Sequence, residues 1–539
     1  MIGRRDGLKI RADIVAGLAV SGLMLPEAVA YATIAGVGPG HAILAAIVGT
    51  LAYALAGRSR FAIVSATSSS AAILAASLAT LPGGAGVRAL FLIVAVAFAG
   101  LLFLLAWIFR LGGLTGFISH PVLRGFAFGL AITICVKQLP VLTGIPPPGG
   151  SLFHTGFEVM RSLPDWHLPS LAVGLVALAA LLTLRRWPGM PGALIVLVSG
   201  VAASGLLDLG AHGVATVGRI ALMPGTSPMP AFSLALVLET AQLAVPLALI
   251  LLAESWGTMR ALALRHGDLL DPGRELRALG LANLAAALVQ GMPVGAGLSA
   301  SAANEASGAQ SRLAGAVAAL ALGALVLFAM PLVALLPQPV LAAVVIAALT
   351  HALDPRPISR LWALDRDQYI ALAAALGVLL LRVLDGMLCA ILLPLAALVQ
   401  RFGNARLARL GRLGASHDFV DADRHPDAQV PAGIAIWRPA APLFFANAER
   451  MFAEIARRTL AGPGTRAVVI SLEESSDIDS TALDALLDFD RAMATKGFAL
   501  RYARVHDRVR DLLHTAGADA LVARCDYSVA DAVARLENP

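Results

Sequence analysis

The chain has 539 residues, of which 58% are hydrophobic and only 14% charged, and its mean hydropathy is +0.78. A soluble domain of ordinary composition carries about 25% charged residues, so this composition excludes a protein that lies wholly in water. The net charge of +6 would suit nucleic-acid binding, but the arginines lie in turns between apolar segments, as the positive-inside rule predicts for a membrane protein, and we expect no nucleic-acid partner.

The first eleven residues are basic and lead directly into apolar sequence, which indicates a membrane helix and not a removable signal peptide. Apolar segments then fall into two sets of seven, from about 13 to 208 and from about 232 to 401. Arginines follow the second, fourth, sixth, eighth, twelfth and last segments, whereas the opposite turns 141–151 and 209–213 contain no Lys or Arg. This alternation predicts fourteen segments in a bacterial inner membrane, with both termini in the cytoplasm.

The third segment of each set is short and follows a stretch rich in Ser, Gly or Pro, at residues 63–70 and 291–299. Interrupted segments at matching positions of two halves are typical of inverted-repeat transporters, whose sites lie near the middle of the membrane. Because seven is an odd number, the second set enters the membrane from the opposite side. The sequence therefore predicts an α-helical 7+7 inverted repeat with alternating access around a central site.

Serines lie at the start of both predicted half-helices, namely Ser68, Ser69 and Ser70 in the first half and Ser299 and Ser301 in the second. A helix that begins inside the membrane exposes its first N–H groups and the positive end of its dipole. Two such ends that face each other favour a small anion between them. The alternative is that these serines only cap kinked structural helices.

Two carboxylates lie inside apolar segments, Glu27 in the first and Glu254 in the eighth, which are the first segments of the two halves. Acids inside a membrane are costly and usually functional. Either could carry a proton with the anion, and Glu254 with Thr258 one turn later could instead hold Na⁺. The alternative is that each acid ends its segment near the interface and is solvated.

The scattered histidines and cysteines lack ligand spacing, so we expect no metal beyond Na⁺ and no other cofactor. The chain also lacks a P-loop and a Gly-x-Ser-x-Gly elbow, which argues against an enzyme.

After the membrane domain (1–412), the polar residues 413–431 suggest a linker, and residues 432–539 suggest a small α/β domain. Its pattern predicts strands at 433–438, 442–445, 467–472 and 498–504, and helices at 449–460, 480–494, 506–515 and 528–536.

Several motifs resemble those of the sulfate permease (SulP/SLC26) family of anion transporters. Residues 26–32 (PEAVAYA) resemble the Pro-Gln-x-x-Ala-Tyr-Ala motif of the family's first helix, and 274–283 and 290–293 are similar to its ninth helix and the approach to its tenth. Residues 477–483 (DIDSTAL) resemble the signature loop of the STAS domain that family members carry at the C-terminus.

This resemblance implies core and gate subdomains, a homodimer, and secondary transport of sulfate, bicarbonate, chloride or dicarboxylates. It implies substrate binding near Tyr31, Ser68, Ser69, Ser299, Ala300 and Ser301, with Glu254 and Thr258 as the Na⁺ ligands of sodium-coupled members. It also implies that Ser480 occupies the position phosphorylated in related anti-sigma antagonists, although in transporters this loop more often binds a cytoplasmic protein partner.

Three positions depart from the family pattern. Glu27 stands where the family usually has Gln, residues 64–66 replace a Gly-Pro pair, and Ala300 stands where many members have Arg. An added acid and a missing cation favour a monovalent anion, or cotransport with H⁺ or Na⁺, over divalent sulfate. A passive anion channel on the same fold, and a membrane-anchored regulator acting through the STAS domain, remain the alternatives.

Overall fold

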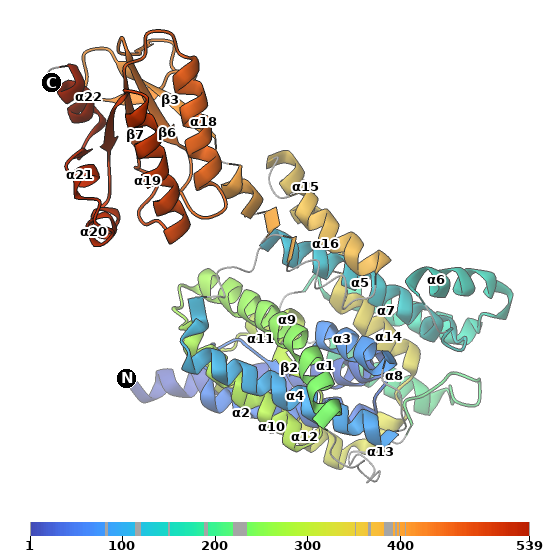
Figure 1. Cartoon of the computed structure of the whole chain (residues 1–539). Coiled ribbons are helices and arrows are strands. Elements are labelled where there is room, and N and C mark those ends of the chain that lie inside the picture. Colours follow the sequence, from blue (N-terminus) through green and yellow to red (C-terminus); the bar gives the residue numbers. More distant parts are fainter. Residues whose placement is uncertain are drawn as a thin grey trace. The chain divides into compact units, whose positions relative to one another are not determined.

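The computed structural model describes residues 2–80, 85–113, 120–148, 151–187, 192–218, 234–350, 352–364, 368–381, 392–393, 396–397, 399–404 and 406–537. The chain divides into two compact units, a helical one over Met1–Leu393 and an α/β one over Pro394–Pro539 (Figure 1). The last predicted membrane segment, which ends near 401, lies largely outside the described residues.

The helical unit contains two runs of elements in the same order. The first comprises α1 (Ile2–Ala35), α2 (Pro39–Ala56), β1 (Val64–Ala66), α3 (Ser68–Thr80), α4 (Ala85–Ile108), α5 (His120–Thr143), α6 (Leu152–Arg161), α7 (Leu168–Leu184) and α8 (Gly192–Leu206). The second comprises α9 (Leu234–His266), α10 (Pro272–Leu288), β2 (Val294–Ala296), α11 (Leu298–Ala306), α12 (Leu313–Phe328), α13 (Met330–Ala334), α14 (Gln338–Leu349), α15 (Arg356–Leu364) and α16 (Gln368–Leu380).

Within the described part of the chain, five helices are long and apolar enough to cross a membrane, at Lys9–Ala35, Pro39–Ala56, Val87–Ile108, Arg124–Thr143 and Ala244–His266. The unit also contains shorter apolar helices of 10–17 residues, among them α7, α8, α12, α14 and α16. The short helices α3 and α11 are the predicted interrupted segments.

A two-stranded ribbon lies where the half-helices begin. β1 and β2 pair antiparallel, with Ser65 opposite Gly295, so α3 and α11 both start from it. Non-helical backbone at membrane depth must find partners within the protein. Thr50 donates to the carbonyl of Val64 at 2.8 Å, and Asn283 makes two bonds to the backbone of Val294, at 2.9 and 3.0 Å. These polar side chains make a strand possible in an apolar interior.

Helix packing separates two groups of helices (Figure 1). α1 packs against α2, α3, α11 and α12, and α4 packs against α9 and α10, whereas α5 packs against α7, α14 and α16. Small residues permit the close approaches, as in other membrane helix pairs. A Cβ added to Gly100 of α4 would lie 3.0 Å from the carbonyl oxygen of Gly280 in α10.

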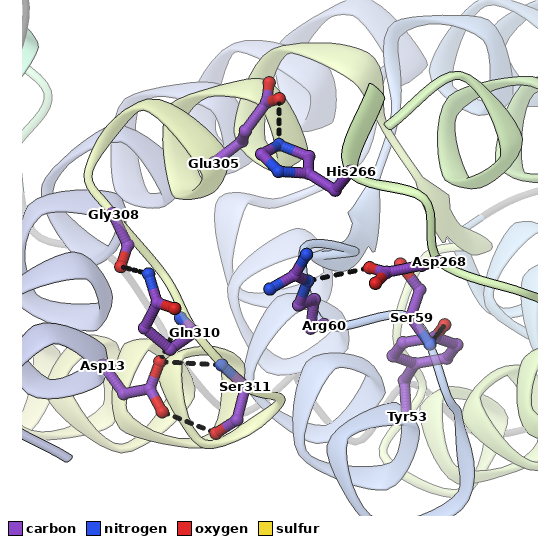
Figure 2. Close-up of polar contacts among 10 residues, drawn as sticks. All are labelled: Asp13, Tyr53, Ser59, Arg60, His266, Asp268, Glu305, Gly308, Gln310 and Ser311. Atoms are coloured by element: carbon purple, nitrogen blue, oxygen red, sulfur yellow. Dashed lines mark hydrogen bonds and ion pairs between the residues drawn. The ribbon is translucent and has the colours of Figure 1, made fainter. Parts of the chain in front are cut away.

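Polar contacts join helices and loops of this unit (Figure 2). The buried Asp13 of α1 accepts from the backbone of Gln310 at 2.6 Å and of Ser311 at 2.9 Å, just before α12. Nearby, His266 at the end of α9 pairs with Glu305 of α11 at 2.7 Å. The Asp13 contacts thus link the two repeats in addition to the central ribbon, and the His266 pair joins two helices of the second repeat.

The C-terminal unit is a mixed sheet covered by helices. Its strands are β3 (Leu407–Leu413), β4 (Phe419–Asp421), β5 (Ala428–Gln429), β6 (Ile434–Pro439), β7 (Ala467–Ser471), β8 (Ala499–Ala503) and β9 (Cys525–Asp526). Its helices are α18 (Ala448–Ala461), α19 (Ser480–Thr495), α20 (Asp507–Thr515), α21 (Asp519–Val522) and α22 (Val529–Glu537). β6 to β9 are parallel, and β3 joins β6 antiparallel and carries β4 and β5. α18 and α19 share one apolar core with the sheet, and α22 shares another.

Three expectations for this unit are wrong. The membrane domain does not extend to 412, because β3 begins at Leu407 within the C-terminal unit. Residues 413–431 are not a free linker, because β4 and β5 pair with β3 and extend the sheet. Their polar composition reflects an exposed sheet edge, where charged residues are common. Residues 442–445 are not a strand either: they are irregular and lead into a turn at 445–447, and the backbone N–H of Leu443 donates to Ser475. The apolar run there reflects the burial of Leu443 and not a strand period.

Candidate functional site

The start of α3 is closed by a reciprocal cap. The hydroxyl of Thr67 accepts from the backbone N–H of Ser70 at 3.2 Å, and the hydroxyl of Ser70 accepts from the N–H of Thr67 at 3.1 Å. This pattern is a capping box, which satisfies two N–H groups that would otherwise lack partners. Ser70 therefore caps its own helix and is fully buried, whereas Ser68 and Ser69 continue the first turn.

The start of α11 is built differently. Its N-cap is Gly297, which supplies no side-chain oxygen. Ser301 does not cap this helix; its hydroxyl accepts from the backbone N–H of Ile63, just before β1, at 3.1 Å. Asn304 likewise donates to the carbonyl of Phe61 at 3.1 Å. The alternative in which Ser301 only caps its own half-helix is wrong for this residue, because its hydroxyl accepts from the backbone of the other repeat.

Each of the two carboxyl groups lies against the half-helix of the other repeat. Glu254 of α9 accepts from the hydroxyl of Thr67 at 2.9 Å and lies beside Ser69, both at the start of α3. Glu27 of α1 lies beside the hydroxyl of Ser299, at the start of α11. Each repeat thus supplies an acid to the half-helix of the other, which is the relation that an inverted pseudo-twofold requires.

The predicted residues lie close together around these contacts. Tyr31, one turn after Glu27, lies near both acids. Glu27 is 4% exposed and Tyr31 5%, so the interpretation of Glu27 as a solvated residue at the interface is wrong. One carboxyl oxygen of Glu27, Oε1, is buried and has no hydrogen-bond partner among the described residues.

Glu254 is half-buried, and Thr258, one turn further along α9, is buried. Ala300, in the first turn of α11, is also buried and brings no charge to the site. The arrangement joins exposed helix ends and hydroxyl donors, which attract an anion, to two acids that can take up a cation.

Two supporting residues were missed from the sequence. Thr67 immediately precedes the serine run, which is the N-cap position of the predicted half-helix, so helix-start rules could have identified it. Ser255 follows Glu254 and accepts from the backbone N–H of Ala296 in β2 at 2.9 Å. Nothing in the linear sequence indicates this second role.

In the C-terminal unit, Ser480 is exposed at the start of α19. Asp479 caps that helix by accepting from Ala482 at 2.8 Å, and it also accepts from the backbone of Phe445 at 2.7 Å. Phe445 itself is 67% exposed. The loop therefore presents an accessible hydroxyl beside an exposed aromatic ring.

Comparison with known proteins agrees with this geometry. The model of the sulfate permease family matches residues 10–375, and that of the STAS domain matches residues 425–532. A protein of Mycobacterium tuberculosis (strain H37Rv) named "Probable sulfate transporter" is 32% identical over 94% of this chain and 91% of its own length. "High affinity sulfate transporter 2" of Stylosanthes hamata is 25% identical over 98% of this chain and 84% of its own.

Solved structures share the fold. Murine Slc26a9, an anion transporter in the inward-facing state, superposes with a TM-score of 0.87 at 19% identity, over 98% of this chain and 91% of that one. The transmembrane domain of BicA, a cyanobacterial bicarbonate transporter, gives a TM-score of 0.60 over 71% of this chain and 97% of its own. The predicted helical membrane fold with a C-terminal STAS domain is confirmed. With a family model that covers most of the membrane unit and relatives that align along nearly the whole chain, this protein belongs to the sulfate permease family of anion transporters.

Proposed function

We propose that this protein is a secondary active transporter that carries a small anion together with H⁺ or Na⁺ by alternating access. The observation that carries the proposal is the crossed pair of contacts between acids and half-helices. Thr67 and Ser69 would donate to an anion held at the start of α3, yet Thr67 donates to the carboxyl group of Glu254, and Ser69 lies beside the same group. The acid and the anion therefore compete for the same donors.

This competition couples the binding of the anion to the binding of a cation at Glu254. A charged carboxylate holds the hydroxyls strongly, because a hydrogen bond to an ionised group is about twice as strong as a neutral one. Protonation of Glu254, or Na⁺ bound beside it with the help of Thr258, weakens that hold and removes the repulsion between acid and anion. Glu27 and Ser299 repeat the arrangement in the second half. An empty carrier with charged acids then binds the anion poorly, and cation and anion move together.

The charge of the site favours a monovalent anion. Glu27 and Glu254 bring two acids to the half-helix ends, and Ala300 brings no compensating cation. A divalent anion such as sulfate, which the relatives' names suggest, would need both acids neutralised. We therefore place bicarbonate and chloride before sulfate and dicarboxylates as substrates.

The same proposal includes a location and an assembly. Basic residues at alternate turns support a bacterial plasma membrane location with both termini in the cytoplasm. The family membership supports a homodimer, and the accessible loop at Ser480 supports a cytoplasmic protein partner of the STAS domain. Transport without chemical conversion is the activity we expect.

The test is uptake of labelled bicarbonate, chloride, sulfate and fumarate into proteoliposomes, with and without an inward H⁺ or Na⁺ gradient. We expect one anion to accumulate only with one of the gradients. Equal uptake with and without a gradient would indicate a passive channel. Undetectable flux of all four anions would indicate a membrane-anchored regulator.

Matched variants assign the coupling residues. Glu254→Gln should keep downhill uptake and lose its acceleration by the gradient, whereas Glu254→Asp should keep part of it. Uptake by Glu27→Gln should lose its pH dependence, and an unchanged pH profile would remove Glu27 from the mechanism. If the gradient is Na⁺, Thr258→Ala should raise the Na⁺ concentration needed for half-maximal uptake, with Thr258→Ser as the conservative control.

A further inference from the structure

A pocket of about 380 Å³ lies between two loops of the membrane unit. The loop after α2 supplies Arg58 and Arg60, the loop before α10 supplies Asp268 and Asp271, and the first turn of α10 supplies Arg274. Three arginines and two aspartates leave the pocket with a net positive charge. No part of it belongs to the proposed transport site at the half-helices.

The two aspartates pair with two of the arginines through Nε only. Arg60 pairs with Asp268 through Nε at 2.7 Å (Figure 2), and Arg274 approaches Asp271 through Nε at 3.5 Å. A guanidinium held in this way still presents its terminal nitrogens, which suit a phosphate. Arg58 is exposed and has no ion-pair partner within the described ranges. Arg274 lies in the first turn of a helix, where a positive charge opposes the dipole, so stability of the helix does not explain it.

Exposed apolar side chains lie in the pocket and at the end of α4, which adjoins the start of α10. Leu269, which lines the pocket, is 99% exposed. At the end of α4, Ile108 is 61% and Phe109 68% exposed. Trp107, next to them, reaches to within 3.8 Å of the position that a Cβ on Gly273 would occupy, at the start of α10. Exposed aromatic and aliphatic side chains beside basic residues are typical of the level where lipid headgroups meet acyl chains.

We propose that this pocket binds the phosphate of an anionic phospholipid. Basic pockets between membrane helices are recognised headgroup sites, and a phosphate could reach this one either from lipid or from solution. The exposed Leu269 favours lipid, because an acyl chain beneath the headgroup would cover this side chain, whereas a soluble phosphate would leave it exposed. Arg58 and Arg274 are the residues that hold the phosphate, and Arg60 is positioned by Asp268 to complete the site.

The experiment uses the full-length protein in detergent, titrated with phosphatidylglycerol or phosphatidylcholine and followed by native mass spectrometry and thermal unfolding. Free glycerol-3-phosphate and inorganic phosphate form two further arms. The test variant is Arg58→Gln with Arg274→Gln, because both side chains are exposed and their loss leaves the Arg60–Asp268 pair intact. Arg360→Gln is the control, because Arg360 is an exposed arginine of α15 outside the pocket.

We expect phosphatidylglycerol to bind the wild type and Arg360→Gln at least fivefold more tightly than the double variant, and to raise the Tm of only the first two. Phosphatidylcholine should bind all three alike. Equal phosphatidylglycerol binding by the double variant and the wild type would overturn the proposal. Saturable binding of glycerol-3-phosphate or inorganic phosphate at lipid-like concentrations would also overturn it, in favour of a soluble ligand.

Discussion

A single hydroxyl group, that of Thr67, both caps α3 and donates to Glu254. Thr67→Ala should therefore destabilise the protein by about 0.5–2 kcal/mol, the usual cost of losing an N-cap, and leave the acid with one donor fewer. Thr67→Ser keeps the oxygen and is the matched control. Thermal unfolding in detergent measures both. If alanine and serine unfold together at the wild-type temperature, the hydroxyl does not cap the half-helix.

Cys525 in the soluble unit should react slowly with thiol reagents at moderately alkaline pH. Burial raises the pKa of its thiol to about 11, from an ordinary value of 9.0. At pH 9 an ordinary thiol is half ionised, whereas the ionised fraction of a thiol with this pKa is about fiftyfold smaller. Only the thiolate reacts, so labelling should be slow. A chain with Cys135→Ser and Cys389→Ser isolates Cys525 for maleimide labelling, folded and in urea. Equal labelling rates in both conditions at pH 9 would contradict the burial of this thiol.

The same shift predicts the direction of a pH effect on stability. The folded state keeps the Cys525 proton to a higher pH than the unfolded state does, because the pKa is raised on folding. The contribution is therefore fully present below pH 9 and is lost as the pH rises through about 11. Unfolding of the STAS domain by urea should need less denaturant at pH 11 than at pH 9, and Cys525→Ala should lessen that difference.

Among the helices, α4 and α10 depend on a pair of glycines. A Cβ on Gly280 would lie 2.8 Å from Leu104 and 3.0 Å from the carbonyl oxygen of Gly100. Gly280→Ala should destabilise the protein by about 1–3 kcal/mol, the usual cost of overpacking. Gly205→Ala in α8 is the control, because nothing lies within 4 Å of that Cβ and alanine favours the helix by up to about 1 kcal/mol. If the two variants unfold at the same temperature, the packing of α4 on α10 is not tight.

The whole membrane unit shows which features a sequence can predict. The interrupted segments were visible because Ser, Gly and Pro break an otherwise apolar pattern, and Glu27 and Glu254 stood out because acids are rare in such segments. The contact of each acid with the other repeat could not be predicted, because it depends on the antiparallel pairing of β1 with β2. The hydrogen bond of Ser301 with the backbone of Ile63 could not be predicted for the same reason. The edge strands after 412 were missed because polar residues at a sheet edge have the same composition as a linker.

Two polar contacts join α2 of the first repeat to α10 of the second. Glu275, near the start of α10, accepts from the hydroxyl of Tyr53 at 2.6 Å and from the backbone N–H of Arg58 at 3.1 Å, at the end of α2. In the related position, His41 near the start of α2 donates to the carbonyl of Gln290 after α10 at 2.5 Å. Each contact joins the start of one repeat's second helix to the end of the other's, so the inverted repeat makes the same connection twice.

The Glu275 contact should be the stronger of the two. Glu275 is 1% exposed. Its removal takes the carboxylate acceptor from the backbone N–H of Arg58 and leaves the Tyr53 hydroxyl, within the described part of the chain, with only the sulfur of Met259, at 3.7 Å, to donate to; an unpaired buried donor costs about 1–3 kcal/mol. Glu275→Ala should therefore lower the Tm more than Glu275→Gln, because glutamine keeps one acceptor oxygen in place. His41→Ala should lower it least, because only one carbonyl loses a donor and a carbonyl tolerates this better than an N–H group does. If all three variants unfold at the wild-type temperature, these contacts do not join the repeats, and the central ribbon with its flanking helices must hold them together without such links.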